Sequence, residues 1–185
     1  MVNAVLLTHG AGSDRDHHTL LALADALAPT PVERIDFPYR REGRKAPDRA
    51  PKLVSCISDE AAALAERVGC DLDEIVYGGR SLGGRMCSLA VAEGLPAAGL
   101  VLISYPLHPP GKPDKMRVDH LPDIDVPCLF VSGDRDPFGT PAELELATAA
   151  VRGPVTHVWV EGGRHDIKGG DQQIVDAVVS WMAGL

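Results

Sequence analysis

A serine framed by glycines lies near the middle of the chain, in the segment 79–83, which reads GRSLG. In such a G-x-S-x-G pattern, the glycines two residues on either side let neighbouring backbone approach a serine held on a tight turn. The apolar run 75–77 precedes the pattern, and a segment with helical spacing follows it. This context predicts that Ser81 is a nucleophile on a strand-to-helix turn. The alternative interpretation is that Ser81 only caps the following helix.

A nucleophilic serine needs a general base, and the base needs a carboxylate that fixes its tautomer and stabilises the charged imidazole. His165 follows paired glycines after an apolar run, so it is the candidate base. The segment 133–137, which reads GDRDP, holds two candidate carboxylates. We favour Asp136, because the proline after it keeps it out of a helical conformation, and Asp134 is the alternative.

The glycine-rich segment 8–12, which reads THGAG, could stabilise the negative charge that develops on a carbonyl oxygen during acyl transfer. Backbone N–H groups on such a turn suit this task, and we expect the oxyanion hole to be formed by Ala11 and Leu82. The segment could instead be a simple turn between a strand and a helix. His9 has no second ligand at a useful spacing, so we expect no metal site.

Short β-branched runs alternate with longer segments of helical periodicity along the chain. The expected strands span residues 2–8, 32–37, 74–77, 99–104, 127–132 and 155–160. The expected helices span residues 19–28, 49–68, 81–93, 141–151 and 171–182. This alternation predicts an α/β fold of about six mostly parallel strands with helices on both faces, in which ligands bind beyond the carboxyl ends of the strands. The candidate residues follow expected strands, so they should meet at that edge.

The chain resembles a minimal α/β-hydrolase, because serine, aspartate and histidine occur in the order of that superfamily's catalytic triad, each after its own strand. It is most similar to the small dienelactone-hydrolase-like proteins and to the testis-expressed α/β-hydrolase-like group, through the segment 78–86, GGRSLGGRM. The resemblance implies a single α/β-hydrolase domain over residues 1–185, without the two antiparallel strands that begin larger members. Dienelactone hydrolases use a cysteine at the position of Ser81, so their substrate is not carried over.

These residues together predict a serine hydrolase that cleaves a small ester or related acyl substrate through an acyl-enzyme, with no cofactor. A thioesterase or a peptidase is an open alternative. The segment 105–121 alone is placed to overhang the site, and it is too short for a large lid, which favours small substrates. A different class of function is a non-catalytic interaction module that keeps the fold. Homodimers are common among such small hydrolases, although no segment of the sequence specifies an interface.

Substrate contacts are expected from His9, Arg80 and Tyr105, which neighbour the candidate segments. Five arginines fall on or near the same edge of an acidic protein: Arg40, Arg80, Arg85, Arg135 and Arg164. They could attract a carboxylate-bearing substrate, or they could pair with neighbouring aspartates, and the sequence leaves both open. The other histidines, His17 among them, are expected at the surface or as helix caps.

The net charge of −8 argues against nucleic acid or an anionic membrane as the main partner. No apolar run approaches the ~18 residues that a membrane span needs. Four cysteines are scattered without paired or metal-type spacing, which suits reduced thiols and predicts a cytoplasmic location. A small-molecule substrate is therefore the expected partner.

Overall fold

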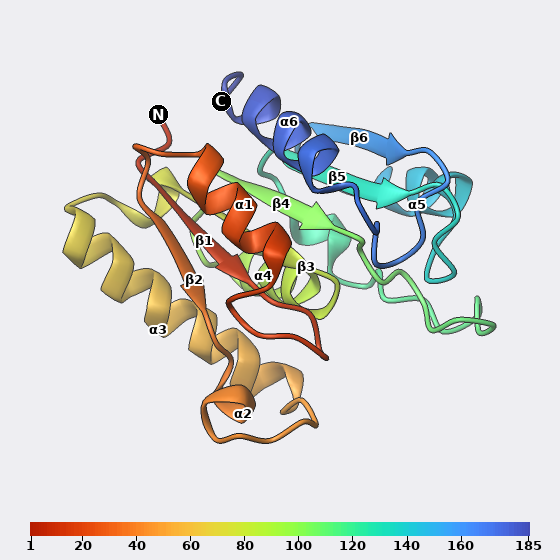
Figure 1. The fold of residues 1–185 in the computed structure, drawn as a ribbon, viewed down its shortest axis with the longest axis horizontal. Helices are drawn as coiled ribbons and strands as arrows, with labels where there is room; N and C mark the ends of the chain where they lie inside the picture. Colours follow the sequence, from red (N-terminus) through yellow and green to blue (C-terminus); the bar gives the residue numbers. More distant parts are fainter.

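One six-stranded sheet forms the centre of the protein, and the computed structural model describes residues 1–185. The strand order is β2-β1-β3-β4-β5-β6, and every neighbouring pair is parallel. The strands are β1 (Ala4–Thr8), β2 (Val32–Ile35), β3 (Ile75–Arg80), β4 (Gly99–Ile103), β5 (Cys128–Gly133) and β6 (Val155–Val160). Because all of them run the same way, their carboxyl ends gather at one edge of the sheet (Figure 1).

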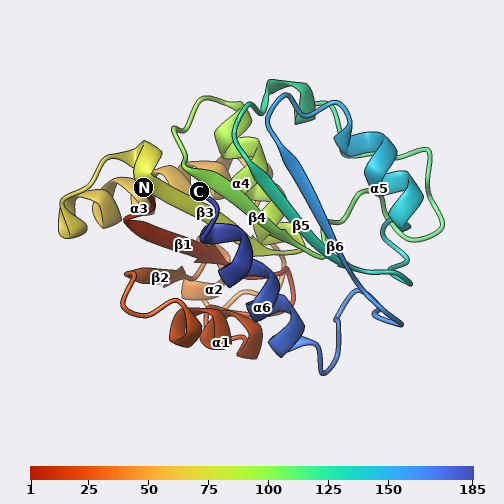
Figure 2. The same cartoon turned by 90° about the horizontal axis from the view of Figure 1, so that it is seen from above.

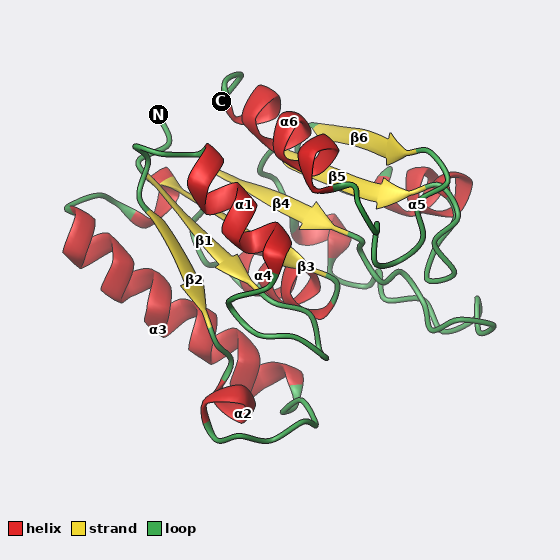
Figure 3. Cartoon of the chain, viewed as in Figure 1, coloured by secondary structure: helices red, strands yellow, loops and turns green.

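Helices cover both faces of this sheet (Figures 2 and 3). One face carries α1 (His18–Ala26) and α6 (Asp171–Met182), and the other carries α3 (Ala50–Val68), α4 (Leu82–Ala92) and α5 (Pro141–Thr148). The remaining helical pieces are α2 (Pro38–Arg41) and two 3-10 turns, Leu72–Glu74 and Leu121–Asp123. None of the helices combines the length and the apolar character needed to cross a bilayer.

Side chains that alternate along the strands supply two separate cores. In β1, Ala4 and Leu6 belong to the core beneath α3 and α4, while Val5 and Leu7 belong to the core beneath α1 and α6. All residues of β1, β3, β4 and β5 are buried. Strands covered on both faces have no polar side to show in their sequence, which explains the nearly continuous apolar runs.

The predicted fold class is confirmed, and the six strands and five longer helices lie within a few residues of their expected ranges. The clearest difference is at β3, which continues through Gly78 and Gly79 to Arg80 instead of ending at Tyr77. Glycine is depleted in strands, so the sequence pattern hid this extension. A side chain at Gly78 would press against Val101 of β4, so the close approach of these two strands requires glycine. The four-residue helix α2 was not expected, because it is too short to leave a periodic pattern.

Candidate active site

Ser81 occupies the sharp turn between β3 and α4. Its backbone has φ 49° and ψ −114°, a strained conformation of the kind found where a serine is held out of a sheet. Two glycines allow the turn: a side chain at Gly79 would clash with Thr8, and one at Gly83 would clash with Thr8 and the carbonyl of His9. The Ser81 hydroxyl makes no helix-capping hydrogen bond, so the interpretation of Ser81 as only a cap is excluded.

A chain of hydrogen bonds joins Ser81 to His165 and Asp136. His165 Nε2 lies 2.8 Å from Ser81 Oγ, and His165 Nδ1 lies 2.8 Å from Asp136 Oδ2. The other carboxylate oxygen of Asp136 accepts the backbone N–H of Phe138 at 2.9 Å. The Phe138 ring also stacks on the imidazole of His165, with ring centroids 4.0 Å apart. An imidazole that donates Nδ1–H to a buried carboxylate keeps Nε2 as the acceptor for the serine proton.

Asp134, the alternative carboxylate, has a different environment. Its backbone N–H donates to the carbonyl of Val160 at 3.1 Å, and its buried Oδ1 has no hydrogen-bond partner. Asp136 is only 3% exposed and its side chain reaches His165, whereas that of Asp134 does not. The structure therefore brings Asp136, and not Asp134, to the histidine.

Two backbone N–H groups near Ser81 are free of other partners. Ala11 lies in the turn after β1, and its N–H donates no hydrogen bond within the protein. Leu82 is the first residue of α4, so its N–H has no acceptor inside the helix and lies at the positive end of the helix dipole. Both residues line the cavity that also contains Ser81. Free donors beside a serine are what a developing oxyanion requires.

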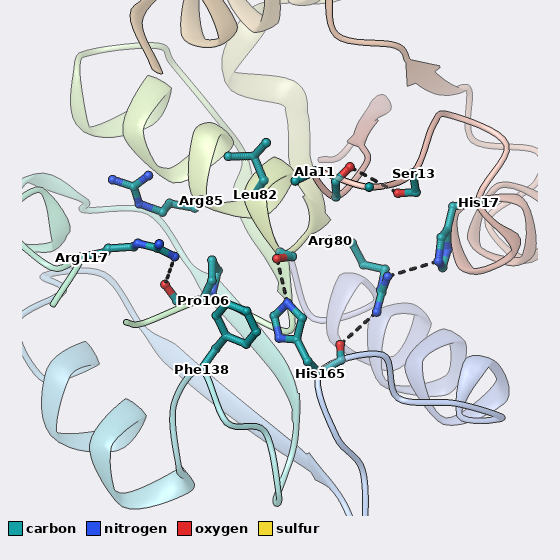
Figure 4. Close-up of a pocket in the computed structure, with 13 residues that line it drawn as sticks. Ala11, Ser13, His17, Arg80, Leu82, Arg85, Pro106, Arg117, Phe138 and His165 are labelled. Carbon is teal, nitrogen blue, oxygen red and sulfur yellow. Dashed lines mark hydrogen bonds between the residues drawn. The ribbon is translucent and has the colours of Figure 1, made fainter. Parts of the chain in front are cut away.

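These groups line a cavity of about 640 Å³ at the carboxyl edge of the sheet (Figure 4). This volume lies within the roughly 300–1,000 Å³ of ordinary small-molecule sites. Most of the lining is polar or glycine. The lining residues are Gly10, Ala11, Gly12, Ser13, His17, Arg80, Ser81, Leu82, Arg85, Pro106, Arg117, Phe138 and His165.

Arg80, one of the expected substrate contacts, lines this cavity but also binds the protein itself. Its Nη2 donates to the backbone carbonyl of His165 at 2.9 Å, and its Nη1 lies 3.1 Å from Nε2 of His17. Burial, with the charge of Arg80, lowers the pKa of His17 to about 4, so that at neutral pH the neutral imidazole accepts this hydrogen bond. Arg80 thus links the turn that carries Ser81 to the loop that carries His165.

The other two expected substrate contacts, His9 and Tyr105, do not line the cavity, and these predictions are corrected. His9 is fully buried: its Nδ1 pairs with the carbonyl of Gly10 at 2.8 Å, and its Nε2 accepts the N–H of Phe37 at 3.2 Å. Tyr105 is 1% exposed, and its hydroxyl donates to the carbonyl of Arg117 at 2.8 Å. Both residues follow strands directly, but the local turns send their side chains into the core instead of toward the edge of the sheet.

Three residues that shape the cavity were not expected there from the sequence. His17 caps α1, where it accepts the N–H of Thr19 at 3.3 Å, but it also lines the cavity. Phe138 stacks on His165, and its only sequence signal was its place shortly after Asp136. Arg117 enters from the segment after β4, which has no periodicity from which the direction of a side chain could be inferred.

The charges on the cavity wall are all positive. Three arginines line it, and no carboxylate does. Of the five arginines expected near this edge, only Arg40 pairs with an aspartate, Asp14, at 3.5 Å. No group of three or more His, Cys, Asp or Glu side chains is arranged to hold a metal ion. The lining therefore suits a neutral or anionic ligand better than a cation.

The α/β-hydrolase fold is defined by an all-parallel sheet with helices on both faces and a strained serine between a strand and a helix. A histidine and an aspartate from later loops complete its site. The comparison with known families agrees: the family described as alpha/beta hydrolase domain matches residues 1–177. The chain belongs to this α/β-hydrolase family.

Solved structures share the fold at low sequence identity. Est1E from Butyrivibrio proteoclasticus superposes with a TM-score of 0.78 at 16% identity, over 99% of this chain and 88% of that one. A dienelactone hydrolase from Anabaena variabilis gives a TM-score of 0.78 at 20% identity, over 99% and 87% of the two chains. A putative hydrolase of the alpha/beta superfamily from Xanthomonas campestris gives 0.72 at 21% identity, over 100% of each chain. These likenesses concern the fold.

Proposed function

We propose that the protein is a serine hydrolase that cleaves a small ester or related acyl compound, with Ser81 as nucleophile, His165 as general base and Asp136 as the orienting acid. The observation that carries the proposal is the hydrogen-bonded chain of Ser81, His165 and Asp136, with its two 2.8 Å links, at the strained turn between β3 and α4. Membership of the α/β-hydrolase family supports it independently.

The reaction proceeds in two halves. Ser81 Oγ attacks the carbonyl carbon while His165 Nε2 takes the hydroxyl proton, and Asp136 stabilises the imidazolium that forms. The N–H groups of Ala11 and Leu82 bind the oxyanion, which collapses to an acyl-enzyme as His165 returns the proton to the leaving alcohol. His165 then takes a proton from water, which attacks the acyl carbonyl, and His165 returns that proton to Ser81 Oγ as the carboxylic acid is released. No cofactor takes part in these steps.

The surroundings of the cavity favour small substrates. The base of the segment after β4 contributes Pro106 and Arg117 to the wall, while the tip of that segment, residues 110–116, is exposed to solvent. A cavity of about 640 Å³ without a helical cover has no long apolar channel for a fatty acyl chain. Thioesters and amides differ from esters only in the leaving group, so they belong to the same proposal as alternative substrates.

The proposal extends to the cell and to the domain. Four free thiols fit a reducing compartment, so we place the activity in the cytoplasm. Residues 1–185 supply every element of the site, so we treat them as one catalytic domain that acts on a small molecule. A homodimer is compatible with this chemistry and is not needed for it.

A fluorophosphonate probe tests the proposal, because an activated serine displaces its fluoride and becomes phosphonylated. We expect mass spectrometry to find one adduct, on Ser81, in the wild type and in Ser180→Ala, a matched control at an exposed position of α6. Ser81→Ala should remain unlabelled. Absence of labelling in a folded wild-type protein would overturn the proposal and favour a non-catalytic interaction module.

A further inference from the structure

Two arginines of the cavity wall lack partners that a buried or half-buried guanidinium normally has. The Nε of Arg85 is buried without an acceptor, and the side chain forms no ion pair. The side chain of Arg117 donates a single hydrogen bond, from Nη1 to the carbonyl of Pro106 at 3.1 Å. A guanidinium has five N–H donors, so most donors of this pair are unused. Leaving buried donors unsatisfied is costly, and a bound acceptor would remove the cost.

The placement of Arg117 is fixed by the core. Its carbonyl accepts the hydroxyl of Tyr105 at 2.8 Å, and its N–H donates to the carbonyl of Leu107 at 2.8 Å. The Tyr105 ring in turn packs against Phe130 of β5, with centroids 5.7 Å apart. Arg117 is therefore held beside the cavity by buried groups and is not a freely mobile surface residue.

No carboxylate neutralises the pair. Elsewhere in the protein arginines have acidic partners, such as Asp48 for Arg44 and Asp16 for Arg34, each at 2.9 Å or less. Arg85 and Arg117 have none, and each adds to the positive charge that the other faces. Burial together with the charge of Arg85 lowers the pKa of Arg117. Like charges held together without a counter-ion form a site that is preorganised for an anion.

The pair lies close to the reacting groups. Arg85 lies one helical turn after Ser81 in α4, since its N–H donates to the carbonyl of Ser81 at 3.1 Å. Arg85 and Arg117 lie on one side of His165, and Arg80 and His17 lie on the other (Figure 4). An anion bound by the pair would therefore belong to one end of a molecule whose carbonyl group is at Ser81.

We propose that Arg85 and Arg117 form a subsite for a carboxylate, so that the preferred substrates are small esters that carry a carboxylate in addition to the scissile bond. This inference rests on the proposed serine-hydrolase function and narrows its substrate class. The protein as a whole carries a net charge of −8, whereas the charged side chains that line this cavity are arginines, which favours an anionic substrate here.

Matched pairs of esters test the subsite by catalysis. The p-nitrophenyl monoesters of succinate, glutarate and adipate place a carboxylate in the acyl part, and p-nitrophenyl esters of monocarboxylic acids of equal length are their neutral controls. Butyrate esters of p-hydroxybenzoate and p-cresol form the pair with the charge in the leaving group. We expect kcat/KM to favour at least one charged member by about 10- to 100-fold, as for hydrogen bonds to charged groups.

Variants link that preference to the two arginines. The ratio of kcat/KM between charged and neutral esters should fall to about one in Arg85→Met and in Arg117→Met, chiefly through KM. Arg152→Met is the control, because it removes the same charge from an exposed position before β6, at the opposite edge of the sheet. A wild-type enzyme with no preference for any charged ester, or a preference that survives both substitutions, would overturn the proposal.

Binding to an inactive variant separates this inference from the proposed function. Calorimetric titration of Ser81→Ala with the monomethyl esters of the same three acids should show binding, and the dimethyl esters should not bind. Adding Arg85→Met to Ser81→Ala should abolish the binding of the monoesters. If the wild type shows neither probe labelling nor hydrolysis but Ser81→Ala still binds the monoesters, the hydrolase proposal fails and the carboxylate subsite stands. If esters are cleaved but no monoester binds more tightly than its diester, the subsite fails alone.

Discussion

Arg80 and Arg85 lie on either side of Ser81 and line the same cavity, yet their surroundings are opposite. Arg80 is 9% exposed and donates hydrogen bonds to the backbone of His165 and to the ring of His17. The buried Nε of Arg85 has no acceptor, and no carboxylate pairs with its side chain. The end of the cavity at Arg80, the closed end, is therefore held by hydrogen bonds within the protein. The end at Arg85, the open end, presents unused donors to a ligand.

Two residues of the same type, close together in the sequence, can therefore have different roles. An arginine whose donors are used by the protein holds segments in place, and its removal should affect orientation and stability. An arginine whose donors are unused contributes little to the folded state and is available to a ligand. Substitutions at the two ends of the cavity should therefore change different measurable quantities.

The largest effect on activity should come from Asp136, which contacts His165 between the two ends of the cavity. Asp136→Asn leaves the shape of the site intact but favours the wrong histidine tautomer, so kcat should fall by ~10⁴-fold. Asp134→Asn is the matched control and should change kcat little, because Asp134 does not contact His165. Steady-state kinetics on one activated ester checks both. A large loss in Asp134→Asn with a small loss in Asp136→Asn would reverse the assignment of the acid.

Arg80→Met should remove the hydrogen bonds that hold the His165 loop at the closed end of the cavity. Loss of the hydrogen bond to the His165 carbonyl frees the histidine loop, so kcat should fall by roughly 10- to 100-fold, whereas KM for a neutral ester stays near its wild-type value. The two lost hydrogen bonds should also lower the free energy of unfolding by about 2 kcal/mol. Urea unfolding and steady-state kinetics measure the two effects. An unchanged kcat would show that Arg80 does not position His165.

Acidic pH should lower the stability of the folded protein through protonation of His17, which pairs with Arg80. The pKa of His17 is about 4 in the folded protein, below the ordinary value of 6.5, because burial and Arg80 disfavour its charged form. Between these values the unfolded chain binds more protons than the folded one, so stability falls as pH drops from 6.5 toward 4. His17→Gln keeps an acceptor for Arg80 without titrating.

The variant should therefore show a shallower loss of stability with acid. After discounting for the half-buried position of the ring, we expect wild type and His17→Gln to diverge by about 1 kcal/mol between pH 7 and pH 4.5. His120, whose pKa burial and Arg85 also lower to about 4, titrates in both proteins and cancels in the difference. Parallel stability curves for the two proteins would contradict this account of His17.

The smallest effect on stability should come from the open end. Arg85→Met removes an unpaired charge from the cavity wall, so the free energy of unfolding without ligand should stay within about 0.5 kcal/mol of wild type or rise slightly. The comparison with Arg80→Met, made in the same urea titrations, is the informative quantity. A loss as large as that of Arg80→Met would mean that Arg85 has a structural role and would remove the contrast between the two ends.

Much of the fold follows from local features of the chain. Apolar runs without a polar alternation predicted strands covered on both faces, and the runs between them predicted helices close to their observed bounds. The turn at Ser81 was predictable because Gly79 and Gly83 are required by close backbone contacts. The end of β3 was not, because glycine opposes strand formation locally and only the neighbouring strands β1 and β4 favour it.

The sequence predicts which segments meet at the site better than it predicts which side chains touch there. That a serine, an acid and a histidine meet follows from the shared direction of parallel strands, which brings their carboxyl ends to one edge. The directions of individual side chains do not follow. Tyr105 and His9 stand at the same edge as Ser81, yet both point into the core, where their polar atoms bind Arg117 and Phe37.

By itself, the sequence determined the order of strands and helices, the turn that holds Ser81 and the set of residues that could meet at the edge of the sheet. Only the tertiary structure decided that Asp136 and not Asp134 reaches His165, that Arg80 is tied to that histidine, and that Arg85 and Arg117 share a wall. The physical reason is that periodicity and turn chemistry act over a few neighbouring residues. The partner of a side chain depends on packing between segments far apart in the chain.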